Sequence, residues 1–343
     1  MADLHPRSCA LDLAPYPTLQ TCRHHSSGLV EYLAASLCAR AEQLAPLSGV
    51  IAAGSIGRLE AGLGSDLDCI LIIPPGRHAP GAVSAAVDEI MAVISAAGLR
   101  LPKAHGIYRT PVAIDDLCRA SSYGDLSESP EIFGKRMQIL LDSRALYGAE
   151  GLREARRRIL QWYWSASRWS GLDQGWEYLA RDLIRYANAY SNWQIFKFAR
   201  TTDDSWLLRQ LKLRSSRYAT WLGLWLPLLY AERAEMDSLE WLAAQLEATP
   251  LERIGACLSA RAPEDFQLFL QRYEQILSVL QDGSCREALL LGGPDEAQRN
   301  FEWDPTVRRA FDAAQTLRTI VTRARARDCA SHSPAEWLHG MPF

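Results

Sequence analysis

The feature that most constrains the fold is a pair of short apolar runs joined by a small turn. The first run, LSGVIAAG, spans 47–54 and ends at a glycine. The second, DLDCILIIPP, spans 66–75 and ends at two prolines. Short apolar runs that are bounded by glycine and proline are typical of buried strands. We therefore expect a sheet that contains these two strands.

The segments around these runs predict helices and one more strand. Apolar residues recur at helical spacing in 26–45 and again in 79–98. The segment KAHGIYRTPVAI, 103–114, alternates enough to predict a third strand. Because proline cannot donate a backbone hydrogen bond, this strand should be broken or placed at an edge at Pro111.

From about residue 132 onward, helical patterns replace the strand signals. All eleven tryptophans follow residue 160, which predicts a helical, aromatic-rich C-terminal part. We divide the chain into an N-terminal extension at 1–25, a sheet-containing domain at 26–145 and an all-helical domain at 146–343. The expected fold class is α+β.

Two acids stand at the start of the second apolar run. Asp66 and Asp68 are two residues apart, so their side chains should project from the same side of the strand. Adjacent carboxylates repel each other and resist burial, and a divalent cation between them removes both costs. Carboxylate oxygen is a ligand that Mg²⁺ prefers, together with water and substrate phosphates. We therefore predict that both residues are catalytic metal ligands.

The turn before these acids has residues that suit a phosphate. Gly54 lets the backbone approach a ligand closely, and the Ser55 hydroxyl and nearby N–H groups can donate to phosphate oxygens. Arg58 adds a planar fork of donors. A glycine-serine turn alone is common, and two acids alone can belong to a solvated strand entrance. Their combination between two apolar strands favours a nucleotide site.

The stretch AAGSIGRLEAGLGSDLDCILII, 52–73, resembles the signature of the DNA polymerase β-like nucleotidyltransferase superfamily. That signature is an apolar strand, a Gly-Gly or Gly-Ser turn, a short helix, and two aspartates on the next strand that are separated by one apolar residue. The longer form, G-S-x-G-R-x-E followed by S-D-L-D, resembles the branch that contains bacterial protein uridylyltransferases. The matching residues are Gly54, Ser55, Asp66 and Asp68 for the superfamily, and Arg58, Glu60 and Ser65 for the branch.

The resemblance covers roughly 25–145 and implies a small mixed sheet with flanking helices and a helical partner domain. It implies transfer of a nucleoside monophosphate from an NTP to a small-molecule or protein acceptor, with release of pyrophosphate. Gly54, Ser55, Arg58 and Ser65 would bind the nucleotide. Asp66 and Asp68 would hold Mg²⁺ or Mn²⁺.

The family usually has a third acid on a later strand, and the body of 103–114 contains none. Asp115 and Asp116 follow that segment and are our candidates for the third ligand or base. His105 is another candidate base, although a histidine near a strand end is more often a packing residue. The alternatives are a site that works with two acids, a catalytically decayed nucleotide-binding or regulatory protein, and a toxin–antitoxin type component.

The helical part offers further basic residues. Lys212 and Arg217 lie in LRQLKLRSSRY, which is denser in charge than helix solubility requires, and we predict that they contact phosphates. Nearby aromatic residues can stack on a base, but their spacing fits a helical core equally well. Arg327 and His332 fit the R-x4-H pattern of HEPN-type ribonucleases. The same pattern recurs at 100–105, so we interpret it as a coincidence.

Composition limits the expected partners and location. A formal net charge of −3 argues against a long nucleic acid as partner. Eight scattered cysteines without a paired motif predict reduced thiols and a cytoplasmic protein. The longest apolar run, 219–231, is too short for a bilayer and contains Pro227, so no membrane segment is expected. The nucleotide base, the acceptor and the oligomeric state are not specified by the sequence.

Overall fold

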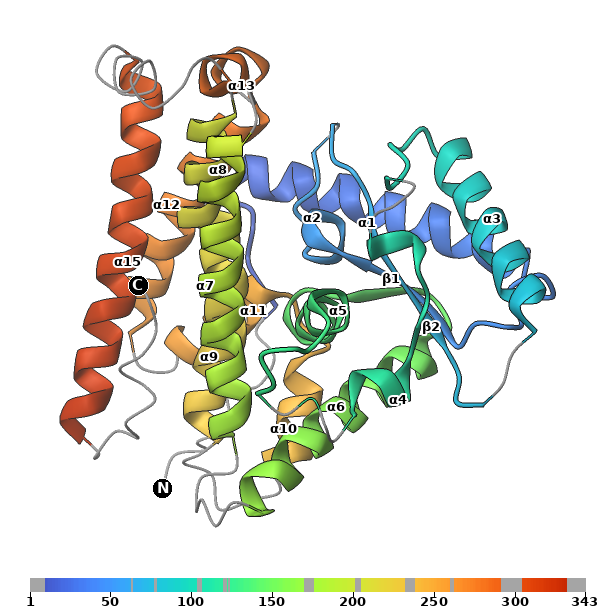
Figure 1. Cartoon of the computed structure of the whole chain (residues 1–343). Helices are drawn as coiled ribbons and strands as arrows, with labels where there is room; N and C mark the ends of the chain where they lie inside the picture. Colours follow the sequence, from blue (N-terminus) through green and yellow to red (C-terminus); the bar gives the residue numbers. More distant parts are fainter. Residues whose placement is uncertain are drawn as a thin grey trace. The chain divides into compact units, whose positions relative to one another are not determined.

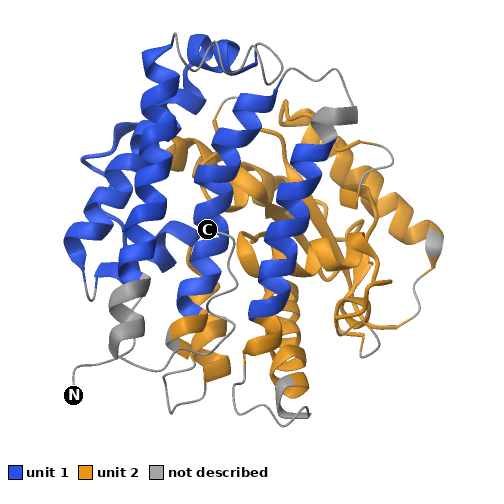
Figure 2. Cartoon of the chain, turned by 60° about the vertical axis from the view of Figure 1, so that its left-hand side comes forward, with its two compact units in different colours: residues 1–20, 180–227, 250–343 blue, residues 21–179, 228–249 orange. Residues whose placement is uncertain are grey.

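The computed structural model describes residues 10–62, 64–76, 79–103, 107–119, 122, 124–169, 176–200, 205–231, 238–259, 262–290 and 304–331 (Figure 1). The chain forms two compact units, which Figure 2 shows in different colours. Unit 1 contains 1–20, 180–227 and 250–343, and unit 2 contains 21–179 and 228–249. The domain boundary expected at 145/146 falls inside unit 2.

Unit 2 contains a four-stranded mixed sheet. Its strands are β1 (Gly49–Ala53), β2 (Asp68–Ile73), β3 (Val112–Ala113) and β4 (Arg144–Tyr147), in the spatial order β3-β2-β1-β4. β1 pairs antiparallel with β2 and with β4, whereas β2 and β3 are parallel. The sheet and its surrounding helices confirm the α+β class.

The two apolar runs form strands as predicted, but the third strand is much shorter than expected. Among the described residues of the segment 103–114, Val112 and Ala113 are in the sheet, and Ile107–Arg109 form a 3-10 turn, η1. Pro111 lacks the N–H group that would extend the ladder toward η1, which fits the short length of β3. Strand β4 was not expected, because 144–147 was included in a helical stretch.

Helices α1 (Pro17–Cys38) and α3 (Pro80–Ala96) cover one face of the sheet (Figure 1). The prediction at 79–98 is confirmed, while α1 both begins and ends earlier than the predicted 26–45. The core on this face is built from one set of alternating strand residues and the facing helix residues. It includes Leu33 and Leu37 from α1, Val50 and Ala52 from β1, Cys69 and Leu71 from β2, and Ile90 and Ile94 from α3.

The remaining helices of unit 2 are α2 (Gly54–Gly57), α4 (Ile114–Leu117), α5 (Pro130–Leu141), α6 (Ala149–Trp169) and α10 (Ser238–Gln245). Buried arginines tie several of them together. Arg136 on α5 donates to both Glu128 carboxylate oxygens and to the Tyr163 hydroxyl of α6. Arg156 on α6 donates to Glu247, which joins 228–249 to the rest of the unit.

Unit 1 is helical and rich in aromatic residues. Trp221, Trp225 and Phe269 are buried in it, and α12 and α15 pack against each other. Within the described residues, no helix is both long and apolar enough to cross a membrane. The helices that contribute to this unit are α7 (Glu177–Arg200), α8 (Trp206–Lys212), the π-helical segment η3 (Leu213–Arg217), α9 (Tyr218–Ala231), α11 (Pro250–Ser259), α12 (Pro263–Gln281), α13 (Gly283–Leu290) and α15 (Pro305–Ser331).

Candidate functional site

The GS turn, residues 54–60, lies directly against the second aspartate. β1 ends at Ala53, which is opposite Asp68 in the antiparallel pair. Gly54 has a φ of +68°, and a Cβ atom placed on it would be 2.6 Å from the Asp68 Oδ2 atom. Only glycine suits this position, because the left-handed backbone and the neighbouring carboxylate both exclude a side chain. The turn and the aspartate therefore form one local structure.

The backbone of the GS turn is held by its own hydrogen bonds. Arg58 N–H donates to the Gly54 carbonyl oxygen at 3.0 Å, and Glu60 N–H donates to the Ser55 carbonyl oxygen at 2.8 Å. A Cβ atom on Gly57 would be 2.0 Å from the Asp142 carbonyl oxygen, so the turn also packs closely on the end of α5. Ser55, the second residue of α2, remains partly exposed beside Gly54.

The strand entrance alternates as a metal-binding pair requires. Leu67 and Cys69 are buried in the core beneath α1 and α3. Asp66 is exposed and Asp68 is half-buried, so the two carboxylates lie on the side away from that core. Burial, and secondarily the Asp68 carboxylate, raises the pKa of the Cys69 thiol to about 12. The thiol therefore stays neutral next to the acids.

Arg58 is buried and forms ion pairs within the protein. Its side chain is 4% exposed, and its guanidinium donates to Glu60 Oε2 at 2.9 Å and to Asp142 Oδ2 at 2.6 Å. Such charge-assisted bonds are strong, and they link the GS turn to a residue 84 positions later in the chain. This geometry favours a role in positioning the turn over the phosphate contact that we predicted for Arg58, which stays a prediction.

The other predicted nucleotide-binding residues lie in different settings. Ser65 is partly exposed, and its hydroxyl accepts a hydrogen bond from Gly62 N–H at 3.1 Å, which closes the loop before Asp66. Lys212 and Arg217 belong to unit 1, where the Arg217 guanidinium lies 5.1 Å from the centre of the Tyr190 ring. The structure thus places Gly54 against Asp68, while Ser55 follows Gly54 and Ser65 and Asp66 precede β2 in the chain.

Asp115 and Asp116 lie at the wrong end of β2 to complete this site. In the parallel pair, Val112 and Ala113 are opposite Ile72 and Ile73, whereas Asp68 begins β2. Five residues separate Asp68 from Ile73, or about 16 Å of strand. Our suggestion that one of these acids is the third ligand is therefore wrong, because β2 and β3 run in the same direction.

Both acids also have other partners. Asp115 forms an ion pair with Arg158 at 2.7 Å, and Asp116 pairs with Arg119. The turn η1, which precedes β3 and contacts β2, contains Tyr108, whose hydroxyl accepts a hydrogen bond from Gln138. Within the described part of the chain, no group of three or more His, Cys, Asp or Glu side chains could hold a metal ion.

Two histidines that the sequence raised as candidates, His105 and His332, lie outside the described residues. The suggestion that His105 is a base and the interpretation of the R-x4-H pattern at His332 as a coincidence are therefore not tested.

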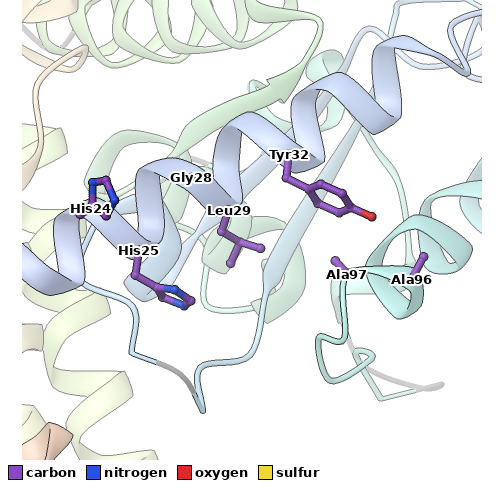
Figure 3. Close-up of a pocket in the computed structure, with 7 residues that line it drawn as sticks. All are labelled: His24, His25, Gly28, Leu29, Tyr32, Ala96 and Ala97. Carbon is purple, nitrogen blue, oxygen red and sulfur yellow. The ribbon is translucent and has the colours of Figure 1, made fainter.

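A pocket of about 530 Å³ lies between α1 and the end of α3, on the face away from the two aspartates. Figure 3 shows His24 and His25 pointing in different directions from α1, while Tyr32 extends toward the end of α3. The two imidazoles therefore do not converge on one ligand atom. The pocket is lined by His24, His25, Gly28, Leu29, Tyr32, Ala96 and Ala97, and it shares no residue with the GS turn.

Comparisons with known proteins returned no similarity: no family model matches the chain, and neither curated proteins nor solved structures gave a match. The candidate site therefore depends on its own residues and geometry.

Sequence reasoning missed Asp142, which completes the ion pairs of Arg58. Its carboxylate is buried at the end of α5. A weak signal existed, because Arg58 and Glu60 are charged residues between two apolar strands and need buried partners if they are covered. Nothing in the sequence identified which acid, 84 residues away, supplies the second bond.

Proposed function

We propose that the chain is a Mg²⁺-dependent nucleotidyltransferase. It moves a nucleoside monophosphate from an NTP to a small-molecule or protein acceptor, with release of pyrophosphate. Free thiols are found at Cys22, Cys38, Cys69, Cys118, Cys257 and Cys285, which is consistent with the cytoplasmic location that we also propose.

The contact between Gly54 and Asp68 is the observation that carries this proposal. A glycine with positive φ, forced against the carboxylate of the next strand, places the Ser55 turn and the acid side by side. This is the arrangement that a metal-bound triphosphate needs, because the acid faces the metal and the turn faces the phosphates. A turn that served only to connect two strands would not require the acid at that position.

The residues present fit Mg²⁺. Asp66 and Asp68 offer carboxylate oxygens from the same side of the strand entrance, and both are accessible. Mg²⁺ is usually bound by one or two carboxylates, with water and substrate phosphates completing the octahedron, so a third protein acid is not obligatory. When bound, the ion would neutralise phosphate charge and align the reacting groups.

In this proposal the side chains position the triphosphate and the metal ion. The Ser55 hydroxyl and the N–H groups of the turn would donate to phosphate oxygens, and the two carboxylates would hold the metal–triphosphate complex. An acceptor oxygen forms a bond to the α-phosphorus as the bond from that phosphorus to the bridging oxygen breaks. Pyrophosphate leaves with that electron pair, and the acceptor proton passes to solvent or to a base.

A nucleotide-binding protein without transferase activity is the second candidate. It is favoured by the sequence of the segment 103–114, which contains no acid that could supply a third ligand beside Asp68. Such a protein would bind Mg²⁺–NTP through the same turn and acids but release no pyrophosphate.

The test compares two double variants that remove the same charge. Asp66→Asn/Asp68→Asn alters the proposed site, and Asp115→Asn/Asp116→Asn alters the exposed acids beyond β3. Binding of each of the four NTPs with Mg²⁺ is measured by calorimetry, using analogues that cannot be hydrolysed. The first variant should weaken binding by tenfold or more, about 1.4 kcal/mol, and the second should leave it unchanged.

Pyrophosphate release in the presence of candidate acceptors then separates the two functions. Release by the wild type that is lost in Asp66→Asn/Asp68→Asn supports the transferase, while binding without release supports the second candidate. Equal NTP affinity in both double variants would contradict the site assignment itself.

A further inference from the structure

A group of aromatic side chains on α7, near the π-helical segment of unit 1, forms a surface that the proposed reaction does not use. Tyr186, Tyr190 and Trp193 are spaced by four and three residues, so they lie on one face of α7. The ring centres of Tyr186 and Tyr190 are 6.1 Å apart, and those of Tyr190 and Trp193 are 5.9 Å apart. Trp221 of α9 contacts Tyr190 edge-on at 6.3 Å. We call Tyr186, Tyr190, Trp193, Trp221 and Arg217 the Trp193 surface.

The exposed fraction of the side chains increases across the Trp193 surface, from the core to solvent. Trp221 is 3% exposed, whereas the Trp193 side chain is 54% exposed. The next turn of α7 continues the exposed part with Phe196 at 61%. Large aromatic side chains that are half or more exposed are costly to leave in water, and clusters of them mark binding surfaces.

An arginine is fixed on these rings. The Arg217 guanidinium lies 5.1 Å from the centre of the Tyr190 ring, as in a cation–π contact. Arg217 ends η3, the π-helical segment between α8 and α9. Short π-helical segments in otherwise α-helical stretches occur often at functional sites, because they change the direction in which the following side chains point.

The charge of this region differs from that of the whole chain. Between residues 180 and 227 the sequence contains eight Lys or Arg and three Asp, although the chain as a whole has a net charge of −3. A positive region with exposed aromatic rings complements a ligand that carries both negative charge and flat rings. Protein interfaces also favour aromatic residues and arginine, so the excess of positive charge is the feature that favours a nucleic acid here.

We propose that the Trp193 surface binds single-stranded nucleic acid, with a base stacked on Trp193 and the backbone phosphates near Arg217. Stacking on an aromatic ring needs an unpaired base, so a duplex should bind less well than a single strand. The inference goes beyond the transferase proposal and does not depend on it. It also refines the expectation from net charge, because the positive charge is local and suits a short strand.

The experiment measures fluorescence anisotropy with a labelled single-stranded oligonucleotide and the corresponding duplex, using the full chain. Trp193→Ala should raise the Kd for the single strand by roughly tenfold, since stacking contributes about 1–3 kcal/mol per base. Trp193→Phe should retain most of the binding. Arg217→Gln should weaken binding and reduce the slope of log Kd against log salt by about one.

Matched controls come from exposed residues elsewhere. Tyr32→Ala removes a 49% exposed aromatic residue of unit 2, and Arg309→Gln removes an exposed arginine of α15. Both should bind the single strand like the wild type. The proposal is overturned if the wild type binds the duplex as tightly as the single strand, if it binds neither, or if Trp193→Ala behaves like Tyr32→Ala.

Discussion

The GS turn of unit 2 and the π-helical segment of unit 1 each contain an arginine that the sequence suggested for phosphate binding, and they use it differently. Arg58 is buried between Glu60 and Asp142. Arg217 is half-buried and lies on the Tyr190 ring. An arginine between two buried carboxylates holds a fold together, whereas one on an aromatic surface can still reach an anionic ligand.

Burial separates the two arginines, since Arg58 is enclosed with Glu60 and Asp142 while Arg217 stays partly exposed. Each arginine follows a small residue and precedes a large one, Leu59 or Tyr218, so local context does not separate them. The distinction arises only when the end of α5 brings Asp142 to the GS turn. Substitutions of the two arginines should therefore change the stability of the protein by different amounts.

The largest expected effect comes from removing the buried cation. Arg58→Met leaves two buried carboxylates without their guanidinium and should lower the free energy of unfolding by about 3–5 kcal/mol. Arg217→Met should lower it by about 1 kcal/mol or less, because it loses a partly exposed cation–π contact. Urea unfolding followed by circular dichroism measures both. Equal losses would remove the contrast between the two regions.

A smaller effect is expected from the backbone of the GS turn. Gly54→Ala forces a Cβ atom into a position 2.6 Å from Asp68 Oδ2 at a φ of +68°, which should cost about 1–3 kcal/mol. Because the Asp68 carboxylate must move, Mg²⁺–NTP binding should weaken as well. The loss of affinity is measured by calorimetry on the folded variant.

Gly134→Ala on α5 is the matched control for that substitution. A Cβ atom at Gly134 would meet nothing within 4 Å, so the variant should gain up to about 1 kcal/mol of stability from the better helix former. It should bind Mg²⁺–NTP like the wild type. If both alanine variants kept full affinity, the close contact between Gly54 and Asp68 would have no functional role.

The sequence predicted local features of this molecule better than it predicted long-range pairings. The strands at 47–54 and 66–75 and the helix at 79–98 follow from apolar patterns and from proline and glycine positions. Strand β4 was missed because its four residues carry no alternation, and its place depends on pairing with β1. The burial of Arg58 was missed for the same reason, since its partner is distant in the chain.

The error about Asp115 and Asp116 was avoidable. A helix between the second and third strands is a crossover connection, and two neighbouring strands joined by such a helix run parallel. Parallel strands place the residues after β3 level with the end of β2, far from Asp68. The mistake came from following the order of residues along the chain and neglecting strand direction.

Cys118, which follows the last residue of α4, is a thiol close to two paired arginines. The Cys118 thiol lies near Arg158 and Arg136, yet burial raises its pKa from 9.0 to about 11. The two arginines, which are paired with Asp115 and Glu128, lower the pKa of this thiol, but burial raises it by more.

This shift has a definite sign in stability. Between pH 9 and pH 11 the unfolded thiol loses its proton while the folded thiol keeps it, so the stability from Cys118 falls as pH rises. The free energy of unfolding of the wild type should decrease relative to Cys118→Ala by up to about 1.4 kcal/mol per pH unit in this range. If the free energy of unfolding fell equally with pH in the two proteins, the arginines would fully offset the effect of burial on the thiol.

The smallest effect should have the opposite sign to that of Arg58→Met. Arg214 lies 5.6 Å from the centre of the Phe311 ring, and burial and the nearby Arg318 lower its pKa. Among the described residues neither arginine has a carboxylate partner. Because two like charges repel, Arg318→Gln should leave stability unchanged or raise it by up to about 0.5 kcal/mol.

Arg323→Gln on the same helix provides the comparison, since Arg323 pairs with Asp265 at 3.5 Å. Its removal should lower the free energy of unfolding by up to about 1 kcal/mol. At about 1 M salt, where the Debye length is about 3 Å, the change for each α15 variant should shrink toward zero. The loss for Arg58→Met should persist, because its ion pairs are buried. A destabilised Arg318→Gln would show that Arg318 has an anionic partner.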